Sequence, residues 1–331
     1  MMINVAVIGA GSWGTTVAHL AAHNMPTTVW ARRQEVADDI NTNHLNSRYL
    51  PDRPLHPDLR ASTDLAATVA AADLLVMGVP SHGFRATLEE LGPHLRPWVP
   101  VISLAKGLEQ GSRLRMTQVV DEVLPGHPAG VLTGPNLAKE ILDGHAAAAV
   151  VAMTDQNVAE RLQEVFATDV FRVYTNHDVI GCEIAGALKN VIALASGMAD
   201  GLGTGDNTRA AVITRGLTEL TRLGVAMGGE QSTFAGLAGM GDLLATCISR
   251  QSRNRHVGEE LGKGKTIEQI IEEMNQVAEG VKTARVVMDL AAELGVETPI
   301  AEEVCAVVED GRSASEAYRG LLRRQIGHEL S

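Results

Sequence analysis

A lysine at position 189 lies in a segment with almost no other charged side chain. Residues 184–195 read IAGALKNVIALA, and the helix that this pattern predicts is apolar on nearly every face and therefore buried. Burial strips water from an ammonium group, lowers its pKa and lets it exchange a proton near neutral pH. Lys189 is therefore a candidate acid–base group, unless its stem carries the ammonium to the surface.

An aspartate stands in a similar setting, because residues 238–246 read AGMGDLLAT with Asp242 at the centre. A buried carboxylate needs a cation, and Lys189 is the expected partner. Asp242 could also cap a helix that begins before Leu243, and the two roles are compatible. An ammonium and a carboxylate in apolar surroundings indicate proton transfer.

A short polar loop is followed by Ser252, Arg253, Asn254 and Arg255, where a further helix is predicted to begin. A hydroxyl, a guanidinium, an amide and the unpaired N–H groups of a helix N-terminus suit a phosphate monoester. A solvated basic loop is the alternative interpretation.

Two more polar segments follow predicted strands. The sequence SLAKGL at residues 103–108 contains Lys106, and GPNLA at residues 134–138 contains Gly134, Asn136 and Ala138. Parallel sheets bind ligands at the carboxyl ends of their strands, so both segments are candidates for ligand binding. Each could instead be an ordinary connecting turn.

The chain begins with an apolar run at residues 3–8, which leads directly into GAGSWG and then into a helical pattern. This order of strand, glycine turn and helix predicts a site for a dinucleotide pyrophosphate. Gly9 allows the tight turn, Gly11 lets the backbone approach the phosphates, and Gly14 lets the helix pack close to the strand. A glycine-rich turn that binds nothing is the alternative.

NAD-selective folds usually carry an acidic residue about twenty positions after this motif, to bind the ribose hydroxyls. Here the predicted strand at residues 27–30 is followed by Ala31, Arg32 and Arg33, and no carboxylate occurs before Glu35. Two guanidiniums suit a 2′-phosphate. We therefore expect NADP(H) to be preferred and NAD(H) to be possible, unless the arginines are only a solvated basic corner.

Composition excludes several classes of protein. The 331 residues and the 45% hydrophobic content allow two domains with a core each, and the net charge of −12 argues against nucleic acid as a partner. The three cysteines lie far apart without clustered histidines, so we expect no metal site and no disulfides. No signal peptide and no stretch of membrane-spanning length is evident, so we expect no stable membrane insertion and a cytoplasmic location.

The first half of the chain alternates strand and helix patterns. Strands are predicted at residues 3–8, 27–30, 73–80, 99–104, 130–133, 147–153 and 171–174, with helices such as 84–91 and 114–123 between them. From about residue 178 onward helices dominate, at 181–198, 207–223, 253–261, 267–274, 283–294 and 299–308. This predicts an α/β fold, with a Rossmann-type mostly parallel sheet covered by helices on both faces at 1–178, and an all-helical domain at 179–331.

Seven segments of the chain together resemble the bacterial NAD(P)-dependent glycerol-3-phosphate dehydrogenase family. They occur in the family's order: GAGSWG, SLAKGLE, GPNLAKE, EIAGALKNVIALASGMADGLG, GLAGMGDLLATC, SRNRHVG and VAEGVKTA. The resemblance implies reversible reduction of dihydroxyacetone phosphate to sn-glycerol 3-phosphate, which supplies glycerophospholipid biosynthesis. It also implies a Rossmann domain, a helical domain, an active site in the cleft between them, and a homodimer.

The resemblance implies roles for individual residues. Lys189 would be the proton acceptor in the oxidation direction, with Asp242 beside it and Lys106 between cofactor and substrate. Implied cofactor contacts beyond the glycines are Ser12, Trp13, Arg32, Arg33, Lys106, Ala138, Arg253, Val277 and Glu279. Implied substrate contacts are Lys106, Gly134, Asn136, Lys189, Asp242, Ser252, Arg253 and Asn254. Val277 and Glu279 rest on the resemblance alone, and Asn136 departs from the serine or threonine more usual at that position.

Two other functions fit parts of the sequence. A 3-hydroxyacid or 6-phosphogluconate-type dehydrogenase also pairs a Rossmann domain with a helical domain that carries a lysine. A non-catalytic NADPH sensor would need the glycine motif, but it has no reason to keep Lys106, Lys189 and Asp242. We therefore expect an oxidoreductase that acts on a small phosphorylated substrate.

Overall fold

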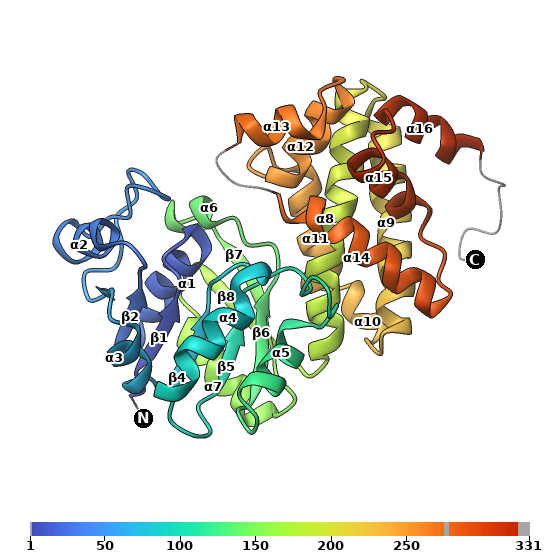
Figure 1. Cartoon of the computed structure of the whole chain (residues 1–331). Coiled ribbons are helices and arrows are strands. Elements are labelled where there is room, and N and C mark those ends of the chain that lie inside the picture. The colour runs from blue at the N-terminus through green and yellow to red at the C-terminus, as the bar shows by residue number, and fades with distance from the viewer. Residues whose placement is uncertain (1, 275–277, 324–331) are drawn as a thin grey trace. The chain divides into compact units, whose positions relative to one another are not determined.

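The computed structural model describes residues 2–274 and 278–323, and the chain divides into two compact units (Figure 1). Unit 1 comprises the described residues through Glu109 together with Leu114–Val179. Unit 2 comprises Gln110–Arg113 and the described residues from Ile180 onward. Unit 1 contains all the strands of the sheet, whereas unit 2 is helical.

Unit 1 is built on an eight-stranded sheet with the order β3-β2-β1-β4-β5-β6-β7-β8. The strands are β1 (Val5–Ile8), β2 (Thr27–Trp30), β3 (Arg60–Ser62), β4 (Leu74–Met77), β5 (Val101–Ser103), β6 (Ala129–Thr133), β7 (Ala147–Ala152) and β8 (Phe171–Asn176). Neighbouring strands are parallel, except that β6 and β7 are antiparallel. The predicted α/β class with a mostly parallel sheet is therefore confirmed.

Helices cover both faces of this sheet because successive strand residues point to opposite sides. In β1, Val5 and Val7 belong to one apolar core, while Ala6 and Ile8 belong to the other. The first core is completed by α1 (Ser12–Ala22), α2 (Gln34–Asn43), α6 (Ala138–Leu142) and α7 (Gln156–Phe166). The second core is completed by α3 (Leu65–Ala70), α4 (Ser81–Leu91) and α5 (Met116–Val123).

The structure corrects several details of the predicted unit 1. The strand expected at residues 73–80 ends at Met77, and Pro80, which has no N–H to give to a neighbouring strand, precedes α4 instead. The strand expected at 99–104 is shorter, and β3 was not predicted, because its three residues are polar or small and lie at the edge of the sheet. The reversed direction of β7 has no signature within its own sequence.

Unit 2 is formed by helices arranged around α8 (Figure 1). The helices are α8 (Val179–Gly201), α9 (Asp206–Ala226), α10 (Gln231–Phe234), α11 (Asp242–Ile248), α12 (Arg253–Gly262), α13 (Ile267–Glu273), α14 (Glu279–Leu294), α15 (Pro299–Glu309) and α16 (Ala314–Arg323). A single π-helical turn, Leu237–Gly241, leads into α11. Of these, α10, the π-helical turn and α16 were not expected from the sequence, whereas α11 begins at Asp242, where a helix was one interpretation of the sequence.

Helix α8 is the buried centre of unit 2. Within the described residues it is the one helix long and apolar enough to cross a membrane, but 94% of its most apolar window is buried inside the protein, as in a core helix. Close approach of α12 contributes to this burial, since a Cβ on Gly258 would lie 2.1 Å from the carbonyl oxygen of Leu194. The N-terminus of α12 is therefore held against the helix that carries Lys189.

Candidate active site

The lysine predicted to be buried is buried, together with two polar partners. Lys189 is 5% exposed, and its Nζ donates to Oδ1 of Asp242 at 2.5 Å and to Oγ1 of Thr246 at 2.6 Å. Asp242 is itself 2% exposed. The ammonium therefore does not reach the surface along its stem, and its partners fix the position of Nζ.

Helix α11 places both partners on one face. Asp242 is its first residue and Thr246 lies four positions later, which brings the two side chains next to each other. The hydroxyl of Thr246 donates to the backbone carbonyl of Asp242 at 2.7 Å, so its oxygen accepts from the lysine. The cap position is occupied by Gly241, and the carboxylate of Asp242 serves the ammonium instead.

The N-terminus of α12 carries the residues expected to bind phosphate. Ser252 is the N-cap, and its Oγ accepts from the backbone N–H of Arg255 at 3.2 Å. The guanidinium of Arg255 donates twice to Oδ2 of Asp200, at 3.0 and 2.7 Å, so it is committed to α8. Arg253 is exposed at the first position of the helix. Because of this exposure, a ligand can reach the side chain of Arg253 from solvent.

Buried amides connect this helix end to two other functional segments. Nδ2 of Asn254 donates to Oδ1 of Asn190 at 2.9 Å, and Oδ1 of Asn254 accepts from the backbone N–H of Gly280 at 2.9 Å. Asn190 follows Lys189 in the chain, and Gly280 follows Glu279, the first residue of α14. The side chain of Asn254 thus links the N-terminus of α12 to α8 at Asn190 and to α14 at Gly280. Val277, the other position implied to contact the cofactor there, lies outside the described residues.

The glycine turn of unit 1 has the geometry of a phosphate-binding loop. Gly9 has φ +113°, and a Cβ on Gly14 would lie 2.0 Å from the carbonyl oxygen of Gly9, so contacts within the protein require both glycines. A Cβ on Gly11, by contrast, would meet no atom within 4 Å. Nothing in the described chain requires a glycine at position 11, and a ligand that approaches the backbone there would explain it.

The polar atoms around this loop also fit a bound dinucleotide. Helix α1 begins after Gly11 with no side chain of the described residues capping its N–H groups. Nε1 of Trp13 is buried and has no hydrogen-bond partner in the described part of the protein, while the Ser12 hydroxyl donates to the carbonyl of Tyr49 at 3.2 Å. Unpaired donors of this kind at a helix N-terminus suit the negative charge of a pyrophosphate.

The two arginines after β2 lie at the surface. Arg32 and Arg33 are both exposed, and Arg33 precedes the first residue of α2 and pairs weakly with Glu35 at 3.4 Å. The structure places them one strand away from the glycine loop, because β2 is paired with β1. Their position fits contact with the adenosine end of a dinucleotide.

The carboxyl ends of β5 and β6 bring three further predicted residues together. Nζ of Lys106 donates to the carbonyl of Gly134 at 2.9 Å. Nδ2 of Asn136 donates to the carbonyl of Ala148 at 3.1 Å, whereas its Oδ1 is buried and accepts no hydrogen bond from the residues described. Ala138 begins α6 beside them. Asn136 therefore offers an acceptor where a serine would offer either a donor or an acceptor.

Sequence reasoning missed three residues of this arrangement: Thr246, Asn190 and Asp200. Thr246 could have been found from its spacing of four residues after Asp242 on a short helix, but the partners of Asn190 and Asp200 lie too far along the chain to be found locally. Cys247, next to Thr246, is not a reactive group, because burial raises the pKa of its thiol to about 12.

Comparison with known proteins places the whole chain in one family. Residues 4–159 match the model of the NAD-dependent glycerol-3-phosphate dehydrogenase N-terminus, and residues 178–319 match that of the C-terminus. A glycerol-3-phosphate dehydrogenase [NAD(P)+] from Mycobacterium avium is 61% identical over 327 residues, covering 98% of this chain and 96% of the relative. A second, from Sphingopyxis alaskensis, is 58% identical over 329 residues, covering 99% of both chains. The crystal structure of glycerol-3-phosphate dehydrogenase from Coxiella burnetii is similar with a TM-score of 0.92 at 35% identity, covering 98% of this chain and 99% of that one.

Proposed function

The chain belongs to the NAD-dependent glycerol-3-phosphate dehydrogenase family, and from this premise we propose that it reversibly reduces dihydroxyacetone phosphate to sn-glycerol 3-phosphate with NAD(P)H. The observation that carries the proposal is the buried Lys189 bound to Asp242 and Thr246. Reduction of a ketone places negative charge and then a proton on its oxygen. A buried, oriented ammonium is suited to supply both the hydrogen bond and the proton.

In this proposal Lys189 is the general acid of the reduction and the general base of the oxidation. Asp242 offsets the cost of burying the ammonium, and Thr246 fixes the direction in which Nζ points. Unit 1 contributes a second cation, Lys106, held by the carbonyl of Gly134. We propose that Lys106 also stabilises the negative charge on the ketone oxygen, so that the chain supplies two ammonium groups for this purpose.

The phosphate of the substrate is proposed to bind at the N-terminus of α12. The exposed Arg253 can form two parallel hydrogen bonds to a phosphate, and the helix end adds N–H groups and a partial positive charge. Ser252 and Asn254 hold this helix end in place through Arg255 N–H and through Asn190. In unit 1, Gly134 and Oδ1 of Asn136 are proposed to contact the substrate hydroxyl.

The dinucleotide is proposed to bind along the glycine turn, with its pyrophosphate at Gly11 and the N-terminus of α1. When bound, it would supply the hydride. Ser12 and Trp13 would contact the pyrophosphate, Arg32 and Arg33 the 2′-phosphate, Ala138 the nicotinamide, and Glu279 and Val277 further parts of the cofactor. The arginine pair and the absence of a carboxylate before Glu35 support a preference for NADP(H).

The proposed product is the backbone of glycerophospholipids, which supports a role in lipid biosynthesis. The three cysteines of the protein are buried and form no disulfide within the described residues, and reduced thiols are typical of the cytoplasm. We therefore propose a cytoplasmic enzyme that supplies phospholipid synthesis.

A spectrophotometric assay tests the function directly. Purified protein is mixed with NADPH or NADH and with dihydroxyacetone phosphate, and the loss of reduced nicotinamide is followed. We expect rapid oxidation with dihydroxyacetone phosphate and slower or no reaction with unphosphorylated dihydroxyacetone. Faster turnover of a 3-hydroxyacid or of 6-phosphogluconate with the oxidised cofactors would favour the dehydrogenase type considered above. Binding of NADPH without oxidation of any substrate would identify a sensor.

A further inference from the structure

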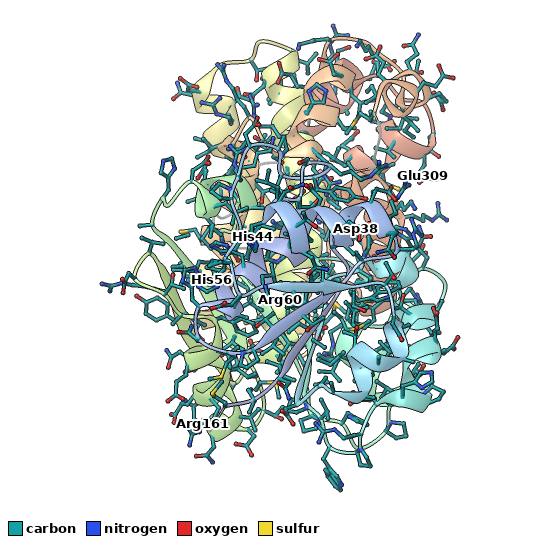
Figure 2. All side chains as sticks on the ribbon, turned by 90° about the vertical axis from the view of Figure 1, so that its left-hand side faces the viewer. Asp38, His44, His56, Arg60, Arg161 and Glu309 are labelled. Atoms are coloured by element: carbon teal, nitrogen blue, oxygen red, sulfur yellow. The ribbon has the colours of Figure 1, made fainter. Side chains whose placement is uncertain are left out.

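A buried asparagine outside the candidate active site is hydrogen-bonded to the glycine turn. Asn46 belongs to the loop that follows α2, between His44 and His56, which are labelled in Figure 2. It is 1% exposed, and Nδ2 donates to the carbonyl of Ala10 at 3.0 Å and to Oγ1 of Thr15 at 2.8 Å. Both N–H groups of this buried amide are therefore used on the two ends of the turn that contains Gly11.

Asn46 also forms a backbone turn within its own loop. The carbonyl of Asn46 accepts from the backbone N–H groups of Tyr49 and Leu50, at 3.1 and 2.8 Å. Tyr49 in turn accepts from the hydroxyl of Ser12 through its carbonyl at 3.2 Å. The turn at residues 46–50 therefore holds the glycine turn at three points, Ala10, Ser12 and Thr15, and Asn46 makes two of these contacts.

The contact with Ala10 determines the orientation of one peptide unit. In a planar trans peptide the C=O of one residue and the N–H of the next point in opposite directions. Because the carbonyl of Ala10 points toward Asn46 in the interior, the N–H of Gly11 points away from it. Gly11 is also the residue at which an added Cβ would meet no atom within 4 Å, so a ligand can approach the backbone closely at this peptide.

From these contacts we propose that Asn46 is a positioning residue for the dinucleotide: it holds the peptide between Ala10 and Gly11 so that the N–H of Gly11 donates to the pyrophosphate. Asn46 itself does not touch the cofactor. The inference rests on the proposed function only in that the glycine turn binds a nicotinamide dinucleotide, and it is independent of the substrate.

Replacement of Asn46 separates this role from simple packing. Asn46→Leu keeps a side chain of similar shape but removes both donors, so the carbonyl of Ala10 is left unsatisfied and its peptide is free to rotate. Asn46→Asp has the same size and can still accept from the Thr15 hydroxyl, but it repels the carbonyl of Ala10. Thr15→Val is the matched control, because it breaks the other contact of Asn46 and leaves the one to Ala10 intact.

The measurement is the affinity of the full-length protein for NADPH and for adenosine 2′-phosphate, which lacks a pyrophosphate. Loss of one charge-assisted hydrogen bond predicts a Kd for NADPH that is raised about tenfold or more in Asn46→Leu and Asn46→Asp. Adenosine 2′-phosphate should bind as it does to the wild type, and Thr15→Val should change the Kd for NADPH by less than about threefold. At saturating NADPH, kcat should stay close to the wild-type value.

Three results would overturn the inference. The first is an unchanged Kd for NADPH in both Asn46 variants, and the second is an equal loss of affinity for NADPH and for adenosine 2′-phosphate, which would indicate general damage to unit 1. The third is a loss in Thr15→Val as large as in Asn46→Asp. Wild-type protein that bound NADPH but did not reduce dihydroxyacetone phosphate would instead refute the proposed function, and the titrations would still decide the role of Asn46.

Discussion

The ion pair between Lys189 and Asp242 is predicted to serve catalysis and to add little to stability. With Nζ and Oδ1 2.5 Å apart, the direct attraction is about 7 kcal/mol at an effective dielectric constant of about 20. The two groups are only 5% and 2% exposed, so the hydration that they lose on folding offsets most of this attraction. Stability and activity should therefore respond differently when one or both charges are removed.

Removing one partner leaves the other charge buried without compensation. We expect Lys189→Met and Asp242→Asn each to lower the free energy of unfolding by about 3–5 kcal/mol. In the double variant the buried charges are gone, and the new amide can donate to Oγ1 of Thr246, which lies 3.3 Å from the present Oδ1. The double variant should therefore unfold within about 1–2 kcal/mol of the wild type, so the two single effects do not add.

Activity should not recover with stability. Without a general acid, kcat for reduction of dihydroxyacetone phosphate should fall about 10²–10⁴-fold in Lys189→Met and in the double variant. Urea unfolding followed by circular dichroism gives the stabilities, and initial rates of NADPH oxidation give kcat. A double variant as unstable as the sum of the single variants would refute the ion-pair argument. Turnover by Lys189→Met within about tenfold of the wild type would remove the lysine from its proposed role.

Three further outcomes are expected. Arg32→Asp should raise KM for NADPH and lower KM for NADH, because a carboxylate repels the 2′-phosphate and binds ribose hydroxyls. Initial rates with each cofactor measure both KM values, and an unchanged ratio of the two would contradict the proposed contact. Arg253→Ala should raise KM for dihydroxyacetone phosphate about tenfold or more in initial-rate measurements, and an unchanged KM would contradict a phosphate contact. Burial lowers the pKa of His19 to about 4, with His23 and His56 adding to the shift. The unfolded chain therefore takes up this proton near pH 6.5 and the folded chain only near pH 4, so up to about 3 kcal/mol of stability is present above pH 6.5 and is lost as the pH falls toward 4. Urea unfolding as a function of pH should show this loss of stability in the wild type. The loss should be smaller in His19→Asn, whose side chain does not titrate but still offers an acceptor to the backbone N–H of His56.

The sequence predicted those elements that a few neighbouring residues are enough to indicate. The glycine turn is flanked by a strand and a helix that each bury an apolar face, so its position was readable from a few residues. The lysine helix could be predicted because Lys189 is the one charged residue in the apolar run at residues 184–195. Strand β3 could not be predicted, since only Arg60, Ala61 and Ser62 form it and none of them is fully buried. The direction of β7 is set by the chain that connects it to β6, which no pattern within the strand records.

The hydrogen-bond partners of the polar side chains were harder to predict from the sequence than the helices and strands. The sequence showed two arginines in the segment at residues 252–255 but not that Arg255 is used by Asp200, which lies 55 positions away. It showed nothing of Asn46, because its surroundings have neither the period of a helix nor that of a strand. Apolar periodicity reports which face of an element is buried, whereas a hydrogen bond between distant segments depends on how those elements are brought together.

These distant partners explain how the chain fixes the geometry of its functional residues. Lys189 pairs with Asp242 across 53 positions, Asn254 with Asn190 across 64, and Asn46 with Ala10 across 36. A buried polar group is costly unless its partner is in place, so each of these bonds penalises any packing of the two segments except the one observed. An apolar contact tolerates small displacements, but these hydrogen bonds do not. The few polar groups inside each unit therefore determine where the ammonium, the helix N-termini and the glycine turn lie.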